Sequence, residues 1–307
     1  MTSPRLLPLL LAITASLAVA QDEPTPGRGT AASWLEGISV STAATASWVD
    51  NLSRTSYAPT RVDADTYELS LEASRHQQLD ANWLLELGAE ANWLKVPDYD
   101  LMDNLRAGVR LGLQRKFGLG PLAPTLQFSG GLTYKDARLA ADRGWTTEAG
   151  IRLVKRLNPS FKLALGGQWL EHDAPSSTFD LQQRSVSLDA VWDLTANWRL
   201  SGSVSRLSGR IVANAAWSVW GQAIGGGFGP RVADYYNAIP WSVTNLYGSG
   251  WVSYNVEANA NLWSLNLAYA VSEHSSVELR YNDAYVINHV DIRYPTESWG
   301  LGFTHRF

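Results

Sequence analysis

The chain has 307 residues, 45% of them hydrophobic and 11% aromatic, which suits either one large barrel or two soluble domains. It contains no cysteine, which excludes disulfide bonds, thiolate metal sites and acylation at a lipoprotein cysteine. A formal net charge of -4 and the lack of a basic run give no indication of nucleic-acid binding.

Residues 1–20 are typical of a secretory signal peptide. Arg5 lies in a short n-region, an apolar run follows, and Ala18-Val19-Ala20 matches an A-x-A cleavage site. We therefore expect the mature chain to start at Gln21. No later run is long and apolar enough to cross a membrane as a helix, so any crossing must be made by strands. Residues 21–35 are rich in Pro, Gly and small polar residues, which indicates a linker.

From residue 36 to residue 307, apolar and polar residues alternate with a period of two, which predicts antiparallel strands. In the first strand Ile38, Val40 and Trp48 share one face, and Ser39 and Ser47 share the other. The pattern predicts twelve strands, in or near residues 38–48, 66–74, 82–93, 105–113, 126–134, 145–153, 161–169, 186–192, 198–204, 263–271, 277–281 and 299–307.

The spacing of Trp83 and Trp93 indicates that these strands cross a membrane. Ten residues correspond to about 33 Å of strand, or roughly 25 Å of height at a barrel tilt near 40°. That height matches the apolar band of a membrane barrel, about 25 Å. Short and long connections alternate, as expected for an up-and-down barrel with an even strand number. Fourteen strands remain an alternative, because residues 241–256 have room for another strand pair.

The last stretch, Trp299 to Phe307, sets Trp299, Leu301 and Phe303 on one face and glycines on the other. An unpaired strand here would be an exposed edge, which closure onto the first strand removes. This ending resembles the closing strand of bacterial outer-membrane β-barrels, in which the terminal Phe, here Phe307, is recognised by the barrel-assembly machinery. The resemblance implies an all-β transmembrane barrel in the outer membrane, with the linker 21–35 in the periplasm.

The face that would line the lumen carries charges of both signs. We expect it to include Glu68, Glu72, Glu86, Glu90, Arg106, Arg110, Glu148, Arg152, Lys162, Asp189, Arg199, Glu278, Arg280 and Arg306. A generic polar interior would explain these residues, and so would a selectivity lining for a solute.

A register for the third and fourth strands whose paired residue numbers sum to 196 places Glu86 opposite Arg110 and Glu90 opposite Arg106. A tight turn at Leu79 places Glu72 beside Glu86 and Glu68 beside Glu90. Two arginines would then serve four carboxylates, which predicts a hydrated acidic wall and a mild cation preference.

The long connection 211–256 is expected to be an outer loop that is rich in aromatic residues. Its candidate ligand-binding residues are Trp217, Trp220, Phe228, Tyr235, Tyr236 and Trp241. Their rings could stack on a surface ligand, or they could pack against one another.

The chemical motifs of an enzyme are weak. Two groups are candidates for a lipid hydrolase: His172 with Asp173, Ser176 and Ser177, and His289 with Asp291. Neither group lies in a catalytic motif, such as G-x-S-x-G, that would fix a nucleophile beside the histidine. Metal-ligand spacing is absent, so we expect no metal, no cofactor and no catalytic residue.

The pattern as a whole favours a passive channel for small polar solutes. The alternatives are a non-conducting barrel whose outer loop binds a surface ligand, and an outer-membrane lipid-modifying enzyme. We expect contact with the lipid bilayer and lipopolysaccharide, passage through the barrel-assembly machinery, and no binding of nucleic acid. A monomer is the expected state, since trimeric porins are larger barrels.

Overall fold

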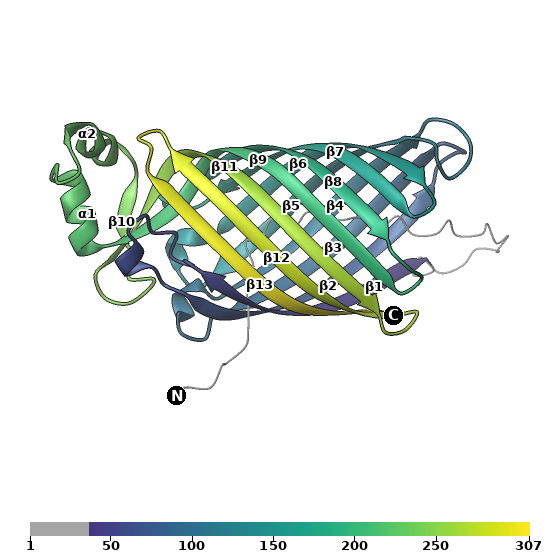
Figure 1. Cartoon of the computed structure of the whole chain (residues 1–307), viewed down its shortest axis with the longest axis horizontal. Helices are drawn as coiled ribbons and strands as arrows, with labels where there is room; N and C mark the ends of the chain where they lie inside the picture. The colour runs from purple at the N-terminus through teal and green to yellow at the C-terminus, as the bar shows by residue number, and fades with distance from the viewer. Residues whose placement is uncertain (1–36) are drawn as a thin grey trace.

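A computed structural model describes residues 37–307, so the expected signal peptide (1–20) and linker (21–35) lie outside the described residues. Twelve long antiparallel strands form a closed barrel (Figure 1). They are β1 (Ile38–Asp50), β2 (Ala64–Gln78), β3 (Trp83–Lys95), β4 (Asn104–Lys116), β5 (Thr125–Ala137), β6 (Gly144–Asn158), β7 (Phe161–Asp173), β8 (Leu181–Asp193), β9 (Trp198–Ala216), β11 (Trp251–Ala270), β12 (Ser275–Asn288) and β13 (Arg293–Arg306).

Closure is made by the pairing of β13 with β1, which runs from Ser41 opposite Arg306 to Asp50 opposite Glu297. This pairing leaves neither strand as an open edge, as the sequence predicts. One further strand, β10 (Trp241–Val243), pairs with β11 beyond the barrel wall and is not part of the ring. The twelve-strand prediction is confirmed, and the fourteen-strand alternative does not form.

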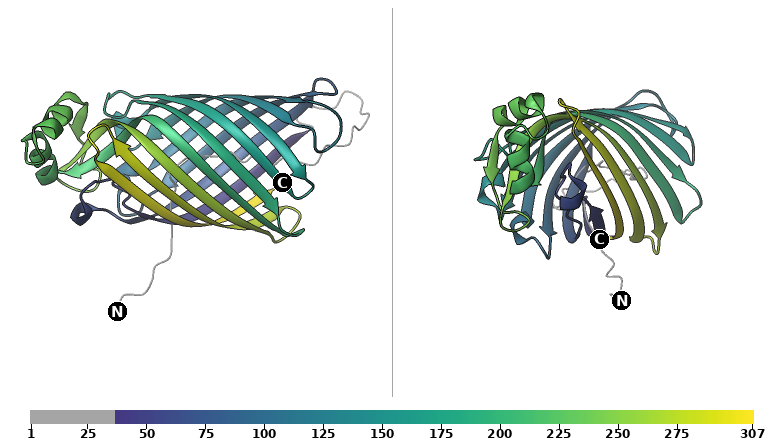
Figure 2. Two further views of the ribbon diagram at one scale, coloured as in Figure 1. Left: turned by 45° about the horizontal axis from the view of Figure 1, so that its top comes forward. Right: turned by 60° about the vertical axis from the view of Figure 1, so that its left-hand side comes forward.

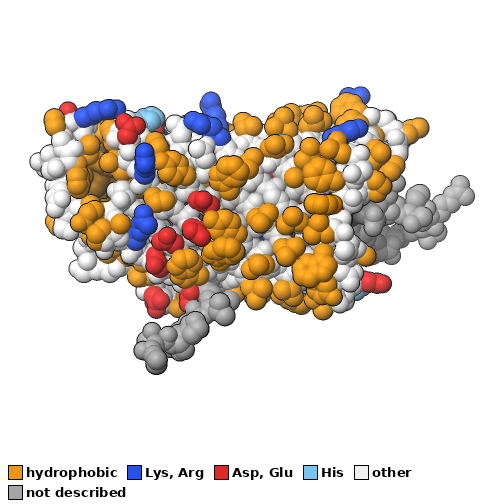
Figure 3. Space-filling view, viewed as in Figure 1, with side chains coloured by type: hydrophobic (Ala, Val, Ile, Leu, Met, Phe, Trp, Pro, Cys, Tyr) orange, Lys and Arg blue, Asp and Glu red, His pale blue; other side chains and the backbone are white. Residues whose placement is uncertain are grey.

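The apolar side chains point outward, because a barrel in lipid reverses the usual burial of apolar groups. Val109 is 60% exposed and Leu165 is 55% exposed, although both lie in the middle of strands. Figure 3 shows apolar side chains spread over the face of the wall that it presents. Within residues 37–307, no helix is long and apolar enough to cross a membrane; that observation has no bearing on strands.

The two ends of the barrel differ. Short turns join β2 to β3, β4 to β5, β6 to β7, β8 to β9 and β11 to β12 at one end, where the chain also terminates at Phe307 (Figure 1). We call this the turn end and the opposite end the loop end. The loop end holds the 3-10 helices η1 (Ala58–Thr60), η2 (Asp100–Met102) and η3 (Ala140–Asp142), and the helices α1 (Trp217–Ile224) and α2 (Pro230–Ala238).

The long connection is shorter than expected, because β9 and β11 continue past the barrel wall. They stay paired as far as Ala216 opposite Trp251. Residues 211–216 and 251–256 are therefore strand rather than loop. Figure 2 shows that this extension leads to α1 and α2 at the loop end.

The predicted registers next to β3 are wrong, by four residues between β2 and β3 and by two residues between β3 and β4. Glu72 lies opposite Glu90 rather than beside Glu86, since the turn after Gln78 is longer than a tight turn at Leu79. Asp80 opens this turn by accepting hydrogen bonds from the backbone N–H groups of Asn82 and Trp83 at 2.7 and 2.9 Å. Glu68 does not pair with Glu90 either.

Between β3 and β4, Arg110 lies opposite Gly88 and Arg106 lies opposite Asn92, instead of opposite Glu86 and Glu90. Because each error is an even number of residues, every side chain stays on its predicted face.

Candidate functional site: the lumen wall and the loop-end cap

The inward faces of β2 and β3 form an acid wall, which we define as Glu68, Glu72, Glu86 and Glu90. Arg110 of β4 forms ion pairs with three of these carboxylates: with Glu72, with Glu86 at 3.7 Å and with Glu90 at 3.5 Å. Glu68 instead accepts a hydrogen bond from the amide of Asn92. One guanidinium thus bridges three carboxylates, two of which are directly opposite each other on adjacent strands.

Glycines on the inward face leave room for these long side chains to lie along the wall. Gly88 is opposite Arg110, and a Cβ at Gly88 would lie 3.6 to 3.7 Å from that arginine side chain. A Cβ at Gly131 would lie 2.7 Å from Oε1 of Glu148, closer than real contacts allow. Glu148 accepts a further hydrogen bond from Gln168 at 3.1 Å.

A basic wall, defined as Arg152, Arg156, Lys162 and Arg199, lies on β6, β7 and β9. Arg152 pairs with buried Asp189 at 2.7 Å, and Arg199 pairs with Asp193 at 2.6 Å.

Toward the turn end, a small cleft is lined by Arg156, Lys162, Asp193 and Arg199 among others. The alternation that predicts the other lumen residues also places Arg156 and Asp193 inward, although the sequence prediction omitted both.

The acid wall and the basic wall are on nearly opposite sides of the lumen, since five strands separate their centres in a ring of twelve. Among the remaining predicted lumen residues, Glu278 and Arg280 of β12 and Arg306 of β13 lie between the two walls, and Arg106 is on β4 next to the acid wall. Arg280 pairs with Glu278 of its own strand at 2.7 Å, and Arg306 is exposed at the turn end. The inward orientation of the predicted residues follows from the register, whereas a role in selectivity stays a prediction.

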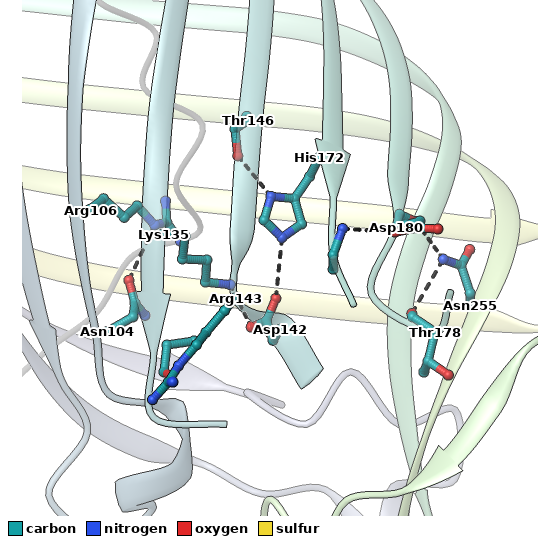
Figure 4. A network of polar contacts seen from close by, with 12 residues as sticks. Asn104, Arg106, Lys135, Asp142, Arg143, Thr146, His172, Thr178, Asp180 and Asn255 are labelled. Carbon is teal, nitrogen blue, oxygen red and sulfur yellow. Dashed lines mark hydrogen bonds and ion pairs between the residues drawn. The ribbon is translucent and has the colours of Figure 1, made fainter. Parts of the chain in front are cut away.

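At the loop end of the lumen, a polar cluster surrounds His172 of β7 (Figure 4). The Nδ1 atom of His172 lies 2.9 Å from the Thr146 hydroxyl, and its Nε2 atom lies 3.7 Å from the Asp142 carboxylate. Asp142 also accepts a hydrogen bond from Lys135 at 2.5 Å. Arg106 donates to the side chain of Asn104 at 3.2 Å in the same region.

The predicted catalytic groupings do not form in residues 37–307. His172 contacts Thr146 and Asp142, as described, rather than Asp173, Ser176 or Ser177. His289 lies 3.7 Å from Glu257, while Asp291 occupies a turn with φ of 63°. No group of three or more His, Asp and Glu side chains in this part of the chain is placed to hold a metal ion.

An apolar cluster lies across the loop end, and we call it the loop-end cap. Its buried members are Phe179, Leu246 and Tyr247, and the side chains packed against them are Leu52, Val62, Tyr99, Leu101, Met102, Leu139, Ala141, Ala174, Val212 and Trp251. These residues come from the four connections between β1 and β8 and from the β9–β11 extension. Since those connections span two thirds of the ring, the cap lies over the opening.

Polar contacts tie the β9–β11 extension to the loops beneath it. Asn214 donates to the backbone carbonyl of Ser53 at 2.8 Å, and Asn255 donates to that of Asp180 at 2.6 Å. The Tyr247 hydroxyl donates to the Leu52 carbonyl at 3.0 Å, and burial raises the pKa of this phenol. Burial also lowers the pKa of the Arg54 guanidinium in the same loop. The sequence pattern gave no signal of these contacts, since they join loops that are distant in the chain.

The aromatic residues of the long connection mostly pack against one another. Trp220 is 1% exposed and stacks on Tyr254 at 4.9 Å, while Tyr236 meets both rings edge-on. Tyr235 is half-buried, and burial raises its pKa to about 12.

A hydrogen-bonded group fixes α2 to the barrel strands. The hydroxyl groups of Tyr236 and Tyr294 are 2.6 Å apart, and the amide of Asn288 donates to both. Trp217, Phe228 and Trp241 remain exposed. Three of the six predicted ligand-binding rings are thus available at the surface.

Comparisons with known proteins identify the fold. No family model matches the chain, and no curated protein matches its sequence. An outer membrane channel from Pseudomonas putida F1 is similar in structure, with a TM-score of 0.56 and 10% identity over 93% of this chain and 100% of that chain.

Two further similar structures are weaker matches. The NanC porin has a TM-score of 0.44 and 8% identity over 87% of this chain and 98% of that one. The KdgM porin in complex with disordered oligogalacturonate has a TM-score of 0.42 and 8% identity over 88% and 99%. The similarity to the Pseudomonas channel shows that this chain has the fold of an outer-membrane β-barrel.

Proposed function

We propose that this barrel is a passive channel of a bacterial outer membrane for small polar and charged solutes. The observation that carries the proposal is the facing arrangement of the acid wall and the basic wall across the lumen. Charged side chains are costly inside a membrane protein unless water or partners surround them. Each wall has unequal numbers of acidic and basic side chains, so some charges have no ion-pair partner of their own within residues 37–307. Such a lumen is therefore suited to water and hydrated solutes.

The acid wall supports a preference for cations along its side of the lumen. Three carboxylates share Arg110, so this cluster keeps a net negative charge, and Glu68 adds another. Near the turn end, the cleft lined by Arg156, Lys162 and Arg199 has the opposite sign, with Asp193 as its carboxylate. We infer that solutes with separated positive and negative groups fit this lumen best.

The loop-end cap makes the outer opening the narrowest part of the proposed path, because side chains from five loops meet there. The non-conducting alternative rests on the same feature, since a complete seal would leave a ligand-binding barrel with Trp217, Phe228 and Trp241 at its surface.

A lipid-modifying enzyme is disfavoured by the placement of His172. This histidine faces the lumen and its side chain is 4% exposed, whereas lipid contacts the outer face of the barrel.

Conductance in planar lipid bilayers tests the proposal. Purified full-length barrel is expected to produce discrete unitary steps that persist after several rounds of repurification. A preparation that is demonstrably folded, with heat-modifiable migration on unboiled gels, but that gives no unitary steps would refute the channel and favour the ligand-binding barrel.

A further inference from the structure

Three arginines form an outward-facing patch where the apolar band of β8 and β9 ends toward the loop end. Arg184 follows the outward face of Val186 on β8, and Arg206 and Arg210 follow that of Val204 on β9. All three arginines are exposed. Ser208, which lies between Arg206 and Arg210 on that face, is opposite Arg184. Arg184 is therefore the diagonal neighbour of both other arginines, roughly 7–8 Å from each at the backbone.

Neighbouring tryptophans place this patch at the level of lipid headgroups. Trp169 is directly opposite Arg184, and Trp263 is opposite Val204, one outward position before Arg206. Tryptophan side chains mark the membrane interface. The arginine stems can thus lie along the apolar band while the guanidinium groups reach the headgroups.

The patch differs from other arginines of the loop end in having no protein partner. In residues 37–307, no ion pair or hydrogen bond engages the guanidinium groups of Arg184, Arg206 or Arg210. By contrast, Arg143 pairs with Asp136 at 3.1 Å, and Arg138 pairs with Asp100 at 3.5 Å.

The nearest carboxylate across the ladder does not neutralise the patch. Glu257, which is opposite Arg210, lies 3.7 Å from His289 instead. Three guanidinium groups at a membrane interface thus share a single face. Within residues 37–307, neither Glu257 nor Glu171, the exposed diagonal neighbour of Arg184 on β7, forms an ion pair with them.

A nearby part of the outer surface, over β12, β13 and β1, has the reverse charge. Glu297 of β13 is opposite both Asp283 of β12 and Asp50 of β1 on the outward face. Figure 3 shows acidic side chains gathered over this region. One strand, β11, separates the arginines of β9 from this acidic region, so an anionic ligand would bind at the arginines and not at β12 and β13.

We propose that Arg184, Arg206 and Arg210 bind the phosphate groups of a phosphorylated lipid headgroup in the leaflet at the loop end. Guanidinium groups match phosphate oxygens in a forked, charge-assisted geometry. A lipid, rather than a soluble phosphate, is the ligand because the patch adjoins the apolar outer surface at Val186 and Val204, where acyl chains pack. The site lies outside the lumen, so it does not depend on conduction.

Native mass spectrometry of the full-length barrel in detergent tests this site, with diphosphoryl lipid A as the added lipid. The wild-type barrel is expected to retain one lipid A per chain, and the variant Arg184→Gln/Arg206→Gln/Arg210→Gln to bind it at least roughly tenfold more weakly, since three exposed charge pairs are lost. The matched control is Arg138→Gln/Arg143→Gln, which removes two paired arginines at the same end. This control is expected to bind lipid A like the wild type.

Two further arms use only the wild-type barrel, so they do not depend on the folding of a variant. Dephosphorylated lipid A should bind at least several-fold more weakly than the diphosphoryl form, and inorganic phosphate at millimolar concentration should fail to displace the lipid. Equal binding of phosphorylated and dephosphorylated lipid would overturn the proposal. Displacement by inorganic phosphate would identify a soluble-anion site, and a dimer that excludes lipid A would identify a second copy as the occupant; either result would also overturn it.

Discussion

Removing the positive charge of Arg110 is the sharpest test of the acid wall. This guanidinium pairs with Glu72, Glu86 and Glu90. Within residues 37–307, Arg110→Gln therefore leaves Glu72 and Glu90 with no basic side chain in ion-pair contact, and Glu86 with His76 alone, at 3.6 Å. We expect a stronger preference for cations over anions. The barrel should still assemble, because the glutamine can lie over Gly88 as the arginine does.

The size of the effect follows from Coulomb's law. A monovalent ion passing about 5 Å from the guanidinium in water has an interaction energy of about 0.8 kcal/mol with that charge. In 0.1 M salt the Debye length of about 10 Å reduces this energy to about 0.5 kcal/mol. Because the lost charge repelled cations and attracted anions, the ratio of cation to anion permeability should rise about fivefold. In 1 M salt, with a Debye length of about 3 Å, the change should nearly vanish.

The measurement is the reversal potential of single barrels in a potassium chloride gradient, at low and at high salt. Arg110→Lys keeps the charge and should match the wild type. Arg206→Gln removes an equal charge from the outer face and should also leave the reversal potential unchanged. An unaltered reversal potential for Arg110→Gln at low salt, in a barrel with normal unitary steps, would refute the reasoning.

Three other outcomes are expected. Glu68→Gln/Glu72→Gln should lower or reverse the cation preference, and unchanged reversal potentials in an open pore would show that these carboxylates do not contribute to selectivity. Tyr247→Ala, which removes the ring packed on Tyr99 at 5.2 Å and the hydrogen bond to Leu52, should raise unitary conductance while heat-modifiable gel migration stays normal; equal conductance would show that the cap is not the narrowest part. Deletion of Phe307 should reduce the amount assembled in outer membranes without altering conductance per barrel, and full assembly of the truncated chain would contradict its role as a recognition feature.

The sequence pattern predicted the barrel because a strand between lipid and water repeats a simple alternation. Leu69 and Leu71 had to alternate with Glu68, Ser70 and Glu72 whichever partners the strand had. Strand number, face and closure all follow from such local information. The register could not be predicted from it, because the alternation does not show how many residues the turn at Asp80 contains.

The loop-end cap could not be predicted from the sequence, for a different reason. Tyr247 meets Tyr99 and Leu52 only because the whole ring brings the three loops to one opening. No periodicity links positions so far apart in the chain. The three-way sharing of Arg110 was missed because it depends on registers that differ from the predicted ones by four residues between β2 and β3 and by two between β3 and β4.

The glycines of the inward face have a consequence for the calibre of the barrel. An alanine at Gly131 would meet Glu148 at 2.7 Å, and one at Gly88 would touch Arg110 at 3.6 Å. A methyl group at Gly131 would push the Glu148 side chain off the wall and toward the central axis, whereas one at Gly88 would only contact Arg110; the net charge would stay the same in both cases. The width of the lumen beside Glu148 therefore depends on a residue that has no side chain, and it can change through a single methyl group independently of the charges that solutes encounter.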